Sequence, residues 1–427
     1  MIYNITDFGA KADGSALCTG AIQAAIDACG VTGGVVNIPA GRYITGTLWL
    51  RDNVELHLEH GAVLRASSDL ADYNETSDYP QNFDCEPEGW CGKHLIIAHE
   101  RTNVAISGGG VIEGAAEAFY GGARLGGNHY SWQDGYYQVA EGAPLRPGQI
   151  VCFIECSHVR VTDITLRNGT CWYLFFHGCE YVQVRGVKIF GHRTHANTDG
   201  IDIDSSRYVT VSDCIIDTGD DAIAIRGDAK RLSDPGKVCE YVSISNCVLS
   251  TSVCAFRVGV GTGRIRFVNI SDINIPRSGQ GLGFMTGWKG RGCVPISDMV
   301  FRNITGDDVG IPLTMNANEA EISRITFDGY RTGCKCCVSI NGNRGAISDI
   351  VLRNVELTDI EHEIKTGASR GDAIFNAREV RNLTVEGLKL NLIDSYYDTR
   401  PREVNTDGST LRSLSGSYTY RGEEHEF

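Results

Sequence analysis

Aspartates are concentrated in one segment of the chain, which runs from His195 to Asp228 and reads HANTDGIDIDSSRYVTVSDCIIDTGDDAIAIRGD. Carboxylates repel one another, so this density is unfavourable unless the side chains are solvated, paired with cations or used in chemistry. Pairs of carboxyl groups are the usual machinery of glycoside hydrolysis, in which one is held protonated as an acid and the other acts ionised as a base or nucleophile. Their mutual repulsion is the physical means by which one of the two keeps its proton.

Three of these aspartates have a spacing that would bring them together. Asp199 and Asp221 are 22 residues apart, which is close to one coil of the repeat described below. Equivalent positions on successive coils of stacked strands lie about 4.8 Å apart. Asp220 would emerge beside them if the backbone bends there, and Gly219 permits such a bend. We therefore predict that Asp199, Asp220 and Asp221 are the catalytic residues.

Other polar and aromatic side chains would line the same site. Asp202 and Asp204 share one face of a strand, where they would bind a cation or sugar hydroxyls, whereas Asp213 and Asp217 fit solvated corners. His195 would contact a sugar or tune an aspartate. For this histidine and for the aromatic residues, a purely structural role is the alternative. The predicted substrate-binding residues are His195, Asn197, Asp202, Arg226, Arg257, Trp172, Trp288 and Lys289.

The elements that must position these residues form a repeat. From residue 150 onward, β-branched segments alternate with polar corners such as Asp163, Asn246, Asn303 and Asn354. Asn and Asp tolerate the left-handed backbone of a tight corner. The period varies around two dozen residues and contains no helices, as a parallel β-helix requires. A leucine-rich repeat would show a fixed Leu and Asn pattern, and a β-propeller would show frequent hairpin turns; neither is present.

One helix is predicted near the start of the chain. Thr19 to Cys29 places Ile22, Ala25, Ile26 and Cys29 on one face, with Gly30 as its end. A helix at this place would cover the exposed end of the first coil. The predicted fold is therefore all-β: a single-stranded right-handed parallel β-helix with an N-terminal capping helix, in one domain over residues 1–427.

The charge and composition of the chain limit the classes of binding partner that we expect. The net charge of −14 is spread along the chain, which disfavours nucleic acid and anionic membranes as partners. No apolar stretch approaches the length of a membrane span, and no signal peptide is recognisable, so we expect a cytoplasmic protein. Of the 16 cysteines, only Cys334, Cys336 and Cys337 cluster, without a nearby histidine. We expect structural thiols in a reducing compartment. The oligomeric state is left open.

The motifs resemble those of the polygalacturonase family, glycoside hydrolase family 28, within the pectin-lyase-like β-helix superfamily. The matching segments are NTDG (197–200), TGDDAIAI (218–225), DFGAKADG (7–14), AIQAAIDAC (21–29), GGVVNIPAGRYITGTLWL (33–50), LHLEHGAVLRAS (56–67) and Arg146-Pro147. The resemblance implies a right-handed β-helix that hydrolyses an oligosaccharide with inversion. It implies Asp220 as the general acid, Asp199 and Asp221 as the residues that hold and activate water, and no metal or organic cofactor.

Two family motifs are missing. The family's Gly-His-Gly corresponds to STSVCAFRVGVG (250–261), which contains no histidine, and its Arg-Ile-Lys corresponds to GLGFMTGWKGRG (281–292), with Phe284 and Met285 in place of Ile and Lys. The motif Arg and Lys bind the substrate carboxylate in the family. Here either Arg226, Arg257, Lys289 or Arg291 takes over, or the sugar is neutral or a deoxy sugar.

We therefore predict an inverting glycoside hydrolase that acts on a pectin-type or related oligosaccharide. Exo action would follow if the long loops between residues 70 and 150 close one end of a groove. The alternatives are a β-helix lyase or epimerase, for which a uronate and often Ca²⁺ are needed, and a non-catalytic glycan-binding β-helix. An unsaturated product or a calcium requirement would identify the lyase, and the absence of any product would identify the binding protein.

Overall fold

The computed structural model describes residues 1–120, 145–288, 292–318, 320–335, 338–342, 346–359, 373–392, 402–420 and 422–427. The chain divides into two compact units. The first contains the chain up to Asp220, apart from residues 127–134, together with Arg231–Lys237; the second contains the remainder, from Asp221. The single domain over residues 1–427 stays a prediction.

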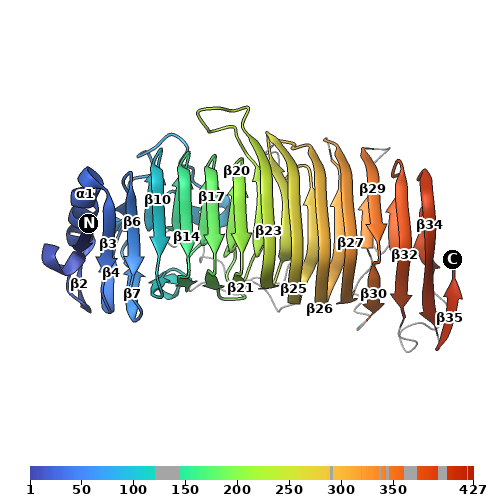
Figure 1. Ribbon diagram of the computed structural model, residues 1–427, viewed down its shortest axis with the longest axis horizontal. Helices are drawn as coiled ribbons and strands as arrows, with labels where there is room; N and C mark the ends of the chain where they lie inside the picture. The colour runs from blue at the N-terminus through green and yellow to red at the C-terminus, as the bar shows by residue number, and fades with distance from the viewer. Residues whose placement is uncertain are drawn as a thin grey trace. The chain divides into compact units, whose positions relative to one another are not determined.

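The first unit is built from parallel strands that stack coil on coil, with three strands in each coil. In Figure 1, β10, β14, β17 and β20 lie side by side, and Val104, Val159, Val182 and Val209 share one register. Strands at the same position of successive coils form three rows. The first row is β9 (Ile96–His99), β13 (Val151–Ile154), β16 (Leu174–His177) and β19 (Ile201–Asp204), and the second is β10 (Thr102–Ser107), β14 (Ser157–Thr162), β17 (Glu180–Arg185) and β20 (Arg207–Ser212). The third row is β11 (Val111–Glu113), β15 (Thr165–Arg167), β18 (Lys188–Phe190) and β21 (Ile215–Thr218).

The remaining elements of this unit are the strands of its first coils and several short helices. They are β1 (Ile2–Asn4), η1 (Ile5–Phe8), β2 (Asp13–Leu17), β3 (Gly34–Ile38), β4 (Gly41–Thr45), β5 (Leu48–Trp49), β6 (Val54–Leu58), β7 (Ala62–Ala66), η2 (Leu70–Asp72), η3 (Glu86–Glu88) and η4 (Ala116–Ala118). β8 (Trp90–Cys91) and β12 (Arg146–Pro147) form a separate two-stranded parallel sheet.

The N-terminal helix α1 (Thr19–Thr32) packs against β1, β3, β5 and β6 of the first coils. Its buried residues are Ile22, Ala25, Ile26 and Cys29, so the predicted apolar face is confirmed. The predicted end at Gly30 is wrong, because the helix continues to Thr32. Gly33 takes the left-handed backbone, with φ 73°, and donates its N–H to the Cys29 carbonyl at 2.8 Å.

The corners between strands adopt the predicted backbone. The φ values of Asp163, Asn246, Asn303 and Asn354 are 63°, 54°, 52° and 52°, which lie in the left-handed region. Asn and Asp are favoured there because a short polar side chain can satisfy the backbone locally. Between the corners the side chains alternate, and in β17 the valines are buried while the intervening polar residues are exposed. This alternation creates the apolar interior of each coil.

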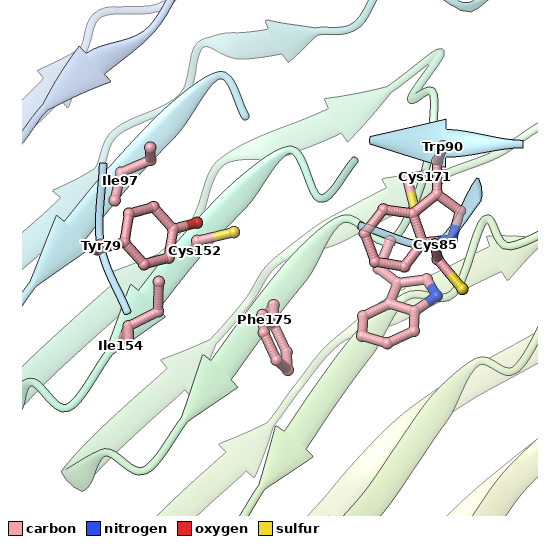
Figure 2. Close-up of a cluster of buried hydrophobic side chains, with 9 residues drawn as sticks. Tyr79, Cys85, Trp90, Ile97, Cys152, Ile154, Cys171 and Phe175 are labelled. Carbon is pink, nitrogen blue, oxygen red and sulfur yellow. The ribbon is translucent and has the colours of Figure 1, made fainter. Parts of the chain in front are cut away.

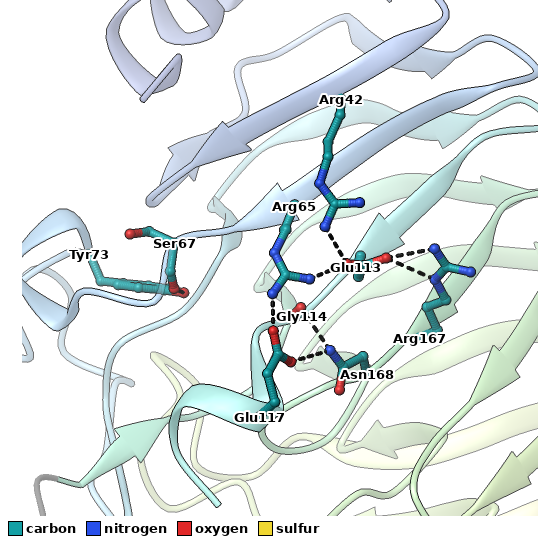
Figure 3. Close-up of polar contacts among 9 residues, drawn as sticks. All are labelled: Arg42, Arg65, Ser67, Tyr73, Glu113, Gly114, Glu117, Arg167 and Asn168. Carbon is teal, nitrogen blue, oxygen red and sulfur yellow. Dashed lines mark hydrogen bonds and ion pairs between the residues drawn. The ribbon is translucent and has the colours of Figure 1, made fainter. Parts of the chain in front are cut away.

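An acidic residue is buried on the outer side of the third row. Glu113 is 6% exposed and accepts hydrogen bonds from Arg42, Arg65 and Arg167 (Figure 3). The Arg42 and Arg167 guanidinium nitrogens are 2.9 and 2.6 Å from the carboxylate. Burial alone would raise the pKa of Glu113, but the hydrogen bonds from Arg167 and Arg65 outweigh it and hold the pKa below its usual value. Arg42, Arg65, Glu113 and Arg167 lie on β4, β7, β11 and β15, so these ion pairs join four successive coils.

The second unit continues the same construction with longer strands. Its strands are β22 (Ile223–Gly227), β23 (Val238–Thr251), β24 (Cys254–Gly261), β25 (Arg264–Met285), β26 (Ile296–Asn316), β27 (Ile322–Cys334), β28 (Val338–Asn341), β29 (Ile347–Arg353), β30 (Glu356–Asp359), β31 (Ala373–Arg378), β32 (Leu383–Asn391), β33 (Arg402–Asn405), β34 (Leu411–Tyr420) and β35 (Glu423–Glu426). β25, β26 and β27 pair in parallel (Figure 1). In the interior, the ring of Phe301 stacks on that of Phe327 with centroids 5.1 Å apart, and it meets Phe284 edge to face at 5.5 Å.

The fold class is therefore confirmed as a right-handed parallel β-helix with an N-terminal helix. Among the described residues, no helix is long and apolar enough to cross a membrane. The described cysteines are buried except Cys293, which is half-buried, in agreement with small apolar side chains. Cys336 and Cys337 lie outside the described residues.

Candidate active site

The segment that carries Asp199 leads directly into β19. The Asp199 carbonyl accepts the Tyr173 N–H at 2.9 Å, and the Gly200 carbonyl accepts the Leu174 N–H at 3.0 Å. These bonds extend the parallel ladder two residues before β19 and fix the backbone of Asp199 on the preceding coil. The Asp199 side chain is 5% exposed. The backbone that carries this carboxylate is therefore already in place before a substrate binds.

Asp220 is brought to Asp199 by the loop that contains Asn197. The Asn197 backbone has φ 54°, and its N–H donates to Asp220 Oδ2 at 3.0 Å. A carboxylate oxygen of Asp199 lies within 4.8 Å of one of Asp220. Two of the three predicted catalytic residues, Asp199 and Asp220, are thus neighbours within the first unit.

Gly219 bends the chain before Asp220 because there is no space for a side chain. A Cβ at this position would lie 2.4 Å from the His192 carbonyl oxygen and 2.5 Å from that of His195. The Gly219 N–H donates to Thr198 Oγ1 at 3.2 Å, and that hydroxyl donates to the His195 carbonyl at 2.8 Å. The glycine therefore allows two loop segments to close on each other beside the aspartates.

Arg146 holds the Asn197 loop in place from the interior of the protein. Its side chain is fully buried, and its guanidinium donates to Asn197 Oδ1 at 2.7 Å, to the Thr170 carbonyl at 2.7 Å and to the Glu88 carbonyl at 2.7 Å. It also lies 5.1 Å from the centre of the Tyr120 ring. In the sequence, Arg146 was only a motif match. Its role was missed because its partners are far apart along the chain.

His195 is an uncharged member of the site. Its ring stacks on Tyr120 at 3.9 Å and on His192 at 4.3 Å. Burial is the main cause that lowers the pKa of His195 to about 4, and the nearby His192 and Arg146 contribute to the same shift. The imidazole is therefore neutral near pH 7 and offers a hydrogen bond instead of a positive charge.

Asp221, which follows Asp220 in the chain, is held within the second unit. Its Oδ2 accepts a hydrogen bond from Arg257 Nε at 3.1 Å, and its Oδ1 accepts the Cys254 N–H at 3.2 Å. Both Asp221 and Arg257 are 8% exposed. Arg257 pairs in register with Gly283 on the next strand, and a Cβ on Gly283 would lie 3.1 Å from Arg257 Nη1. The glycine leaves room for the guanidinium.

Two further predicted residues of the second unit lie in or beside its strands. Arg226 is 8% exposed on β22, two residues after Ala224, whose register partner is Arg257. Trp288 is half-buried after β25. Lys289 lies outside the described residues.

Trp172 and Asp202 lie below the surface of the first unit. Trp172 is 3% exposed and packs with Trp90 and Phe175 in the apolar cluster shown in Figure 2. Asp202 is fully buried on β19, in register with Phe175. The structure gives Trp172 a packing role, and a contact of either side chain with a sugar stays a prediction. The covering segment around Trp90 was not recognisable from the sequence.

Comparisons with known proteins agree with this site. The family model of glycosyl hydrolases family 28 matches residues 81–330, which include all three aspartates. The chain is 31% identical over 252 residues to the exo-poly-alpha-D-galacturonosidase of Dickeya chrysanthemi, covering 52% of this chain and 41% of that protein. It is 26% identical over 365 residues to the endo-polygalacturonase of Pectobacterium carotovorum subsp. carotovorum, covering 82% and 86% of the two chains.

Solved structures agree on the fold. The family 28 exopolygalacturonase of Yersinia enterocolitica superposes with a TM-score of 0.68 at 20% identity, covering 96% of this chain and 78% of that one. The match to the Dickeya protein spans less than half of that protein's length. The family match, in contrast, covers more than half of this chain and contains the aspartate motifs. This chain belongs to glycosyl hydrolases family 28.

Proposed function

We propose that the chain hydrolyses an O-glycosidic bond in a pectin-type polymer or oligosaccharide, with inversion and from a chain end. The observation that carries the proposal is the approach of Asp199 and Asp220 to within 4.8 Å, in a chain of this family. Exo action is supported by the relative from Dickeya chrysanthemi, which is named as an exo-acting galacturonosidase.

Each aspartate has a distinct role in the proposed reaction. Asp220 donates its proton to the glycosidic oxygen as the bond to the anomeric carbon breaks. Asp199 and Asp221 orient a water molecule and accept its proton as the new bond to the anomeric carbon forms. Arg257 holds Asp221 in one orientation through the 3.1 Å hydrogen bond. The Asn197 N–H does the same for Asp220 at 3.0 Å.

The carboxylate spacing makes the stereochemical outcome a sharp test. Inverting enzymes usually separate their two carboxyl groups by about 6.5–9.5 Å and retaining enzymes by about 5–5.5 Å. The closest oxygens of Asp199 and Asp220 are nearer than either range. Inversion is therefore supported by the family and not by this distance. Proton NMR of the first sugar released, before it mutarotates, distinguishes the two outcomes.

The sugar in the cleavage subsite is proposed to be galacturonate, with Arg257 as its cation. Gly283 stands where the first residue of the family's Arg-Ile-Lys would be, and the Arg257 guanidinium fills the space beside it. Arg binds carboxylates strongly through charge-assisted hydrogen bonds. A neutral or deoxy sugar is the second candidate. It is favoured by the apolar Met285 and the fully buried Phe284, which supply no charge, and by the ion pair that already engages Arg257.

The experiment is a screen of galacturonate, rhamnose-containing and neutral oligosaccharides, with products followed by NMR without added calcium. We expect a saturated monosaccharide from a chain end. Release of oligomers instead of a monosaccharide would show endo action. An ultraviolet-absorbing unsaturated product would show a lyase, and no product from any glycan would favour a binding protein.

Asp220→Asn tests the proposed acid. The amide keeps the shape of the side chain but has no proton to donate, so turnover should fall by about 10²–10⁴-fold. Asp213→Asn is a matched control, because Asp213 lies at a left-handed corner outside the site. Turnover within twofold of the wild type in Asp220→Asn would refute the assignment.

A further inference from the structure

A second cluster of titratable side chains lies at the corner that follows β9 and β13. His99 is the last residue of β9 and pairs in register with Ile154, so Glu100 and Glu155 occupy equivalent corner positions on successive coils. Their φ values are 54° and 50°. One ligand atom from each of His99, Glu100 and Glu155 lies within 4.8 Å of the other two.

Among the residues that the structure describes, Glu100 and Glu155 have no lysine or arginine partner. Like charges one coil apart repel each other, and such pairs are normally relieved by a proton, a basic side chain or a metal ion. Within the described part of the chain, neither Glu100 nor Glu155 forms an ion pair with a lysine or arginine. The neighbouring cation, Arg101, is turned to Asp52 at 3.3 Å instead.

The histidine in this cluster is suited to bind a metal. Its Nε2 atom is buried and has no hydrogen-bond partner among the described residues. A neutral imidazole has a lone pair on one ring nitrogen, which is the form that binds metal ions.

Gln81 supplies an independent indication that a ligand binds at this corner. Its side chain is 5% exposed, and its Nε2 donates to a Glu155 carboxylate oxygen. Its Oε1 is buried without a hydrogen-bond partner in the described residues. Because the amide oxygen and nitrogen share one carbon, this unpartnered acceptor lies at the edge of the same cluster. Buried carbonyl oxygens are rarely left unsatisfied.

We propose that His99, Glu100, Glu155 and Gln81 form a binding site for one divalent transition-metal ion, Mn²⁺ or Zn²⁺. A mixed nitrogen and oxygen set suits these ions, whereas Ca²⁺ and Mg²⁺ take oxygen ligands. Ligand atoms about 2.0–2.2 Å from an ion lie roughly 3–4.4 Å apart. Adjustments of a few tenths of an ångström therefore close the cluster on the ion. Glu100 is exposed and provides the entry path.

The ion would fasten two surface segments to the coils. Gln81 follows Tyr79, which packs in the apolar cluster and whose ring lies 5.4 Å from His99. Glu155 also accepts the Ser233 N–H at 3.1 Å, so the segment Arg231–Lys237 meets the same carboxylate. Metal binding would stabilise this corner whatever reaction the aspartates catalyse, so the proposal stands apart from the proposed function.

The test uses the full chain after removal of metal with a chelator. MnCl₂ is titrated and followed by electron paramagnetic resonance, because thiolates bind Mn²⁺ weakly and the cysteines then do not compete. We expect one bound ion per chain and a melting temperature that rises with MnCl₂ concentration. No saturable binding of either MnCl₂ or ZnCl₂ would overturn the proposal.

Variants locate the site. Glu100→Gln removes a charge from an exposed side chain, so the variant should fold, and its Mn²⁺ affinity should fall at least about tenfold. Glu155→Gln should do the same. Asp163→Asn is the control, since Asp163 is an exposed carboxylate at a corner with φ 63° and has no histidine beside it. Unchanged affinity in Glu100→Gln, or an equal loss in Asp163→Asn, would overturn the assignment.

Discussion

Gly219→Ala should damage catalysis without removing any catalytic group. The added Cβ would lie 2.4 Å from the His192 carbonyl oxygen, whereas ordinary contact begins at about 3.4 Å. The backbone beside Asp220 must therefore move by about 1.0 Å. A displacement of this size at a catalytic group typically lowers the rate by about 10²-fold. Overpacking of this kind also destabilises a protein by about 1–3 kcal/mol.

The assay compares kcat/KM on the substrate found in the screen with the melting temperature of each variant. Gly20→Ala is the matched control, since a Cβ there would meet no atom within 4 Å. We expect Gly219→Ala to lose activity at temperatures where it is still folded, while Gly20→Ala keeps both activity and stability. If Gly219→Ala has the activity and melting temperature of the wild type, the packing argument for Asp220 is refuted.

Two further predictions concern residues around the aspartates. Arg146→Lys keeps the charge but cannot reproduce the three hydrogen bonds to Asn197, Thr170 and Glu88. The kcat of this variant should fall about tenfold or more, with Arg160→Lys measured as the control. An unchanged kcat would contradict the positioning role of Arg146. His195 has a folded pKa of about 4, below its unfolded value of 6.5, so the folded state binds fewer protons between these values. Its contribution to stability is present above pH 6.5 and declines as the pH falls toward 4. The decline in melting temperature over this window should be smaller in His195→Gln, and an equal decline would contradict the lowered pKa.

The repeat and its corners were predictable because they depend on neighbours in the sequence. Alternating valines predict strands, and Asp163 and Asn246 at the corners tolerate the backbone observed there. The coil length alone pairs Asp199 with Asp221 in the sequence. The prediction for Asp220 depends in addition on a bend at Gly219, and Asp220 lies beside Asp199. These features require only local preferences and the spacing between stacked strands.

What the sequence could not indicate depends on contacts over long separations. Arg146 reaches Asn197 across 51 residues, and no local pattern marks a buried arginine. Trp172 packs against Trp90, which is distant in the sequence, and no local pattern indicates this contact. The end of α1 was misplaced because Gly30 and Gly33 are equally good terminators locally, and the packing of the helix decides between them.

The place of Arg257 beside Gly283 has a consequence for how this architecture changes over evolution. Adjacent coils are separated by about 4.8 Å, which is less than the length of an arginine side chain. A charge lost from one coil can therefore be supplied from the coil before it, provided that the vacated position is small. A recognition group can move along the sequence by one repeat while its charge stays at the same point in space. The specificity of such proteins is then better compared between residues that occupy the same point in space on neighbouring coils than between aligned sequence motifs.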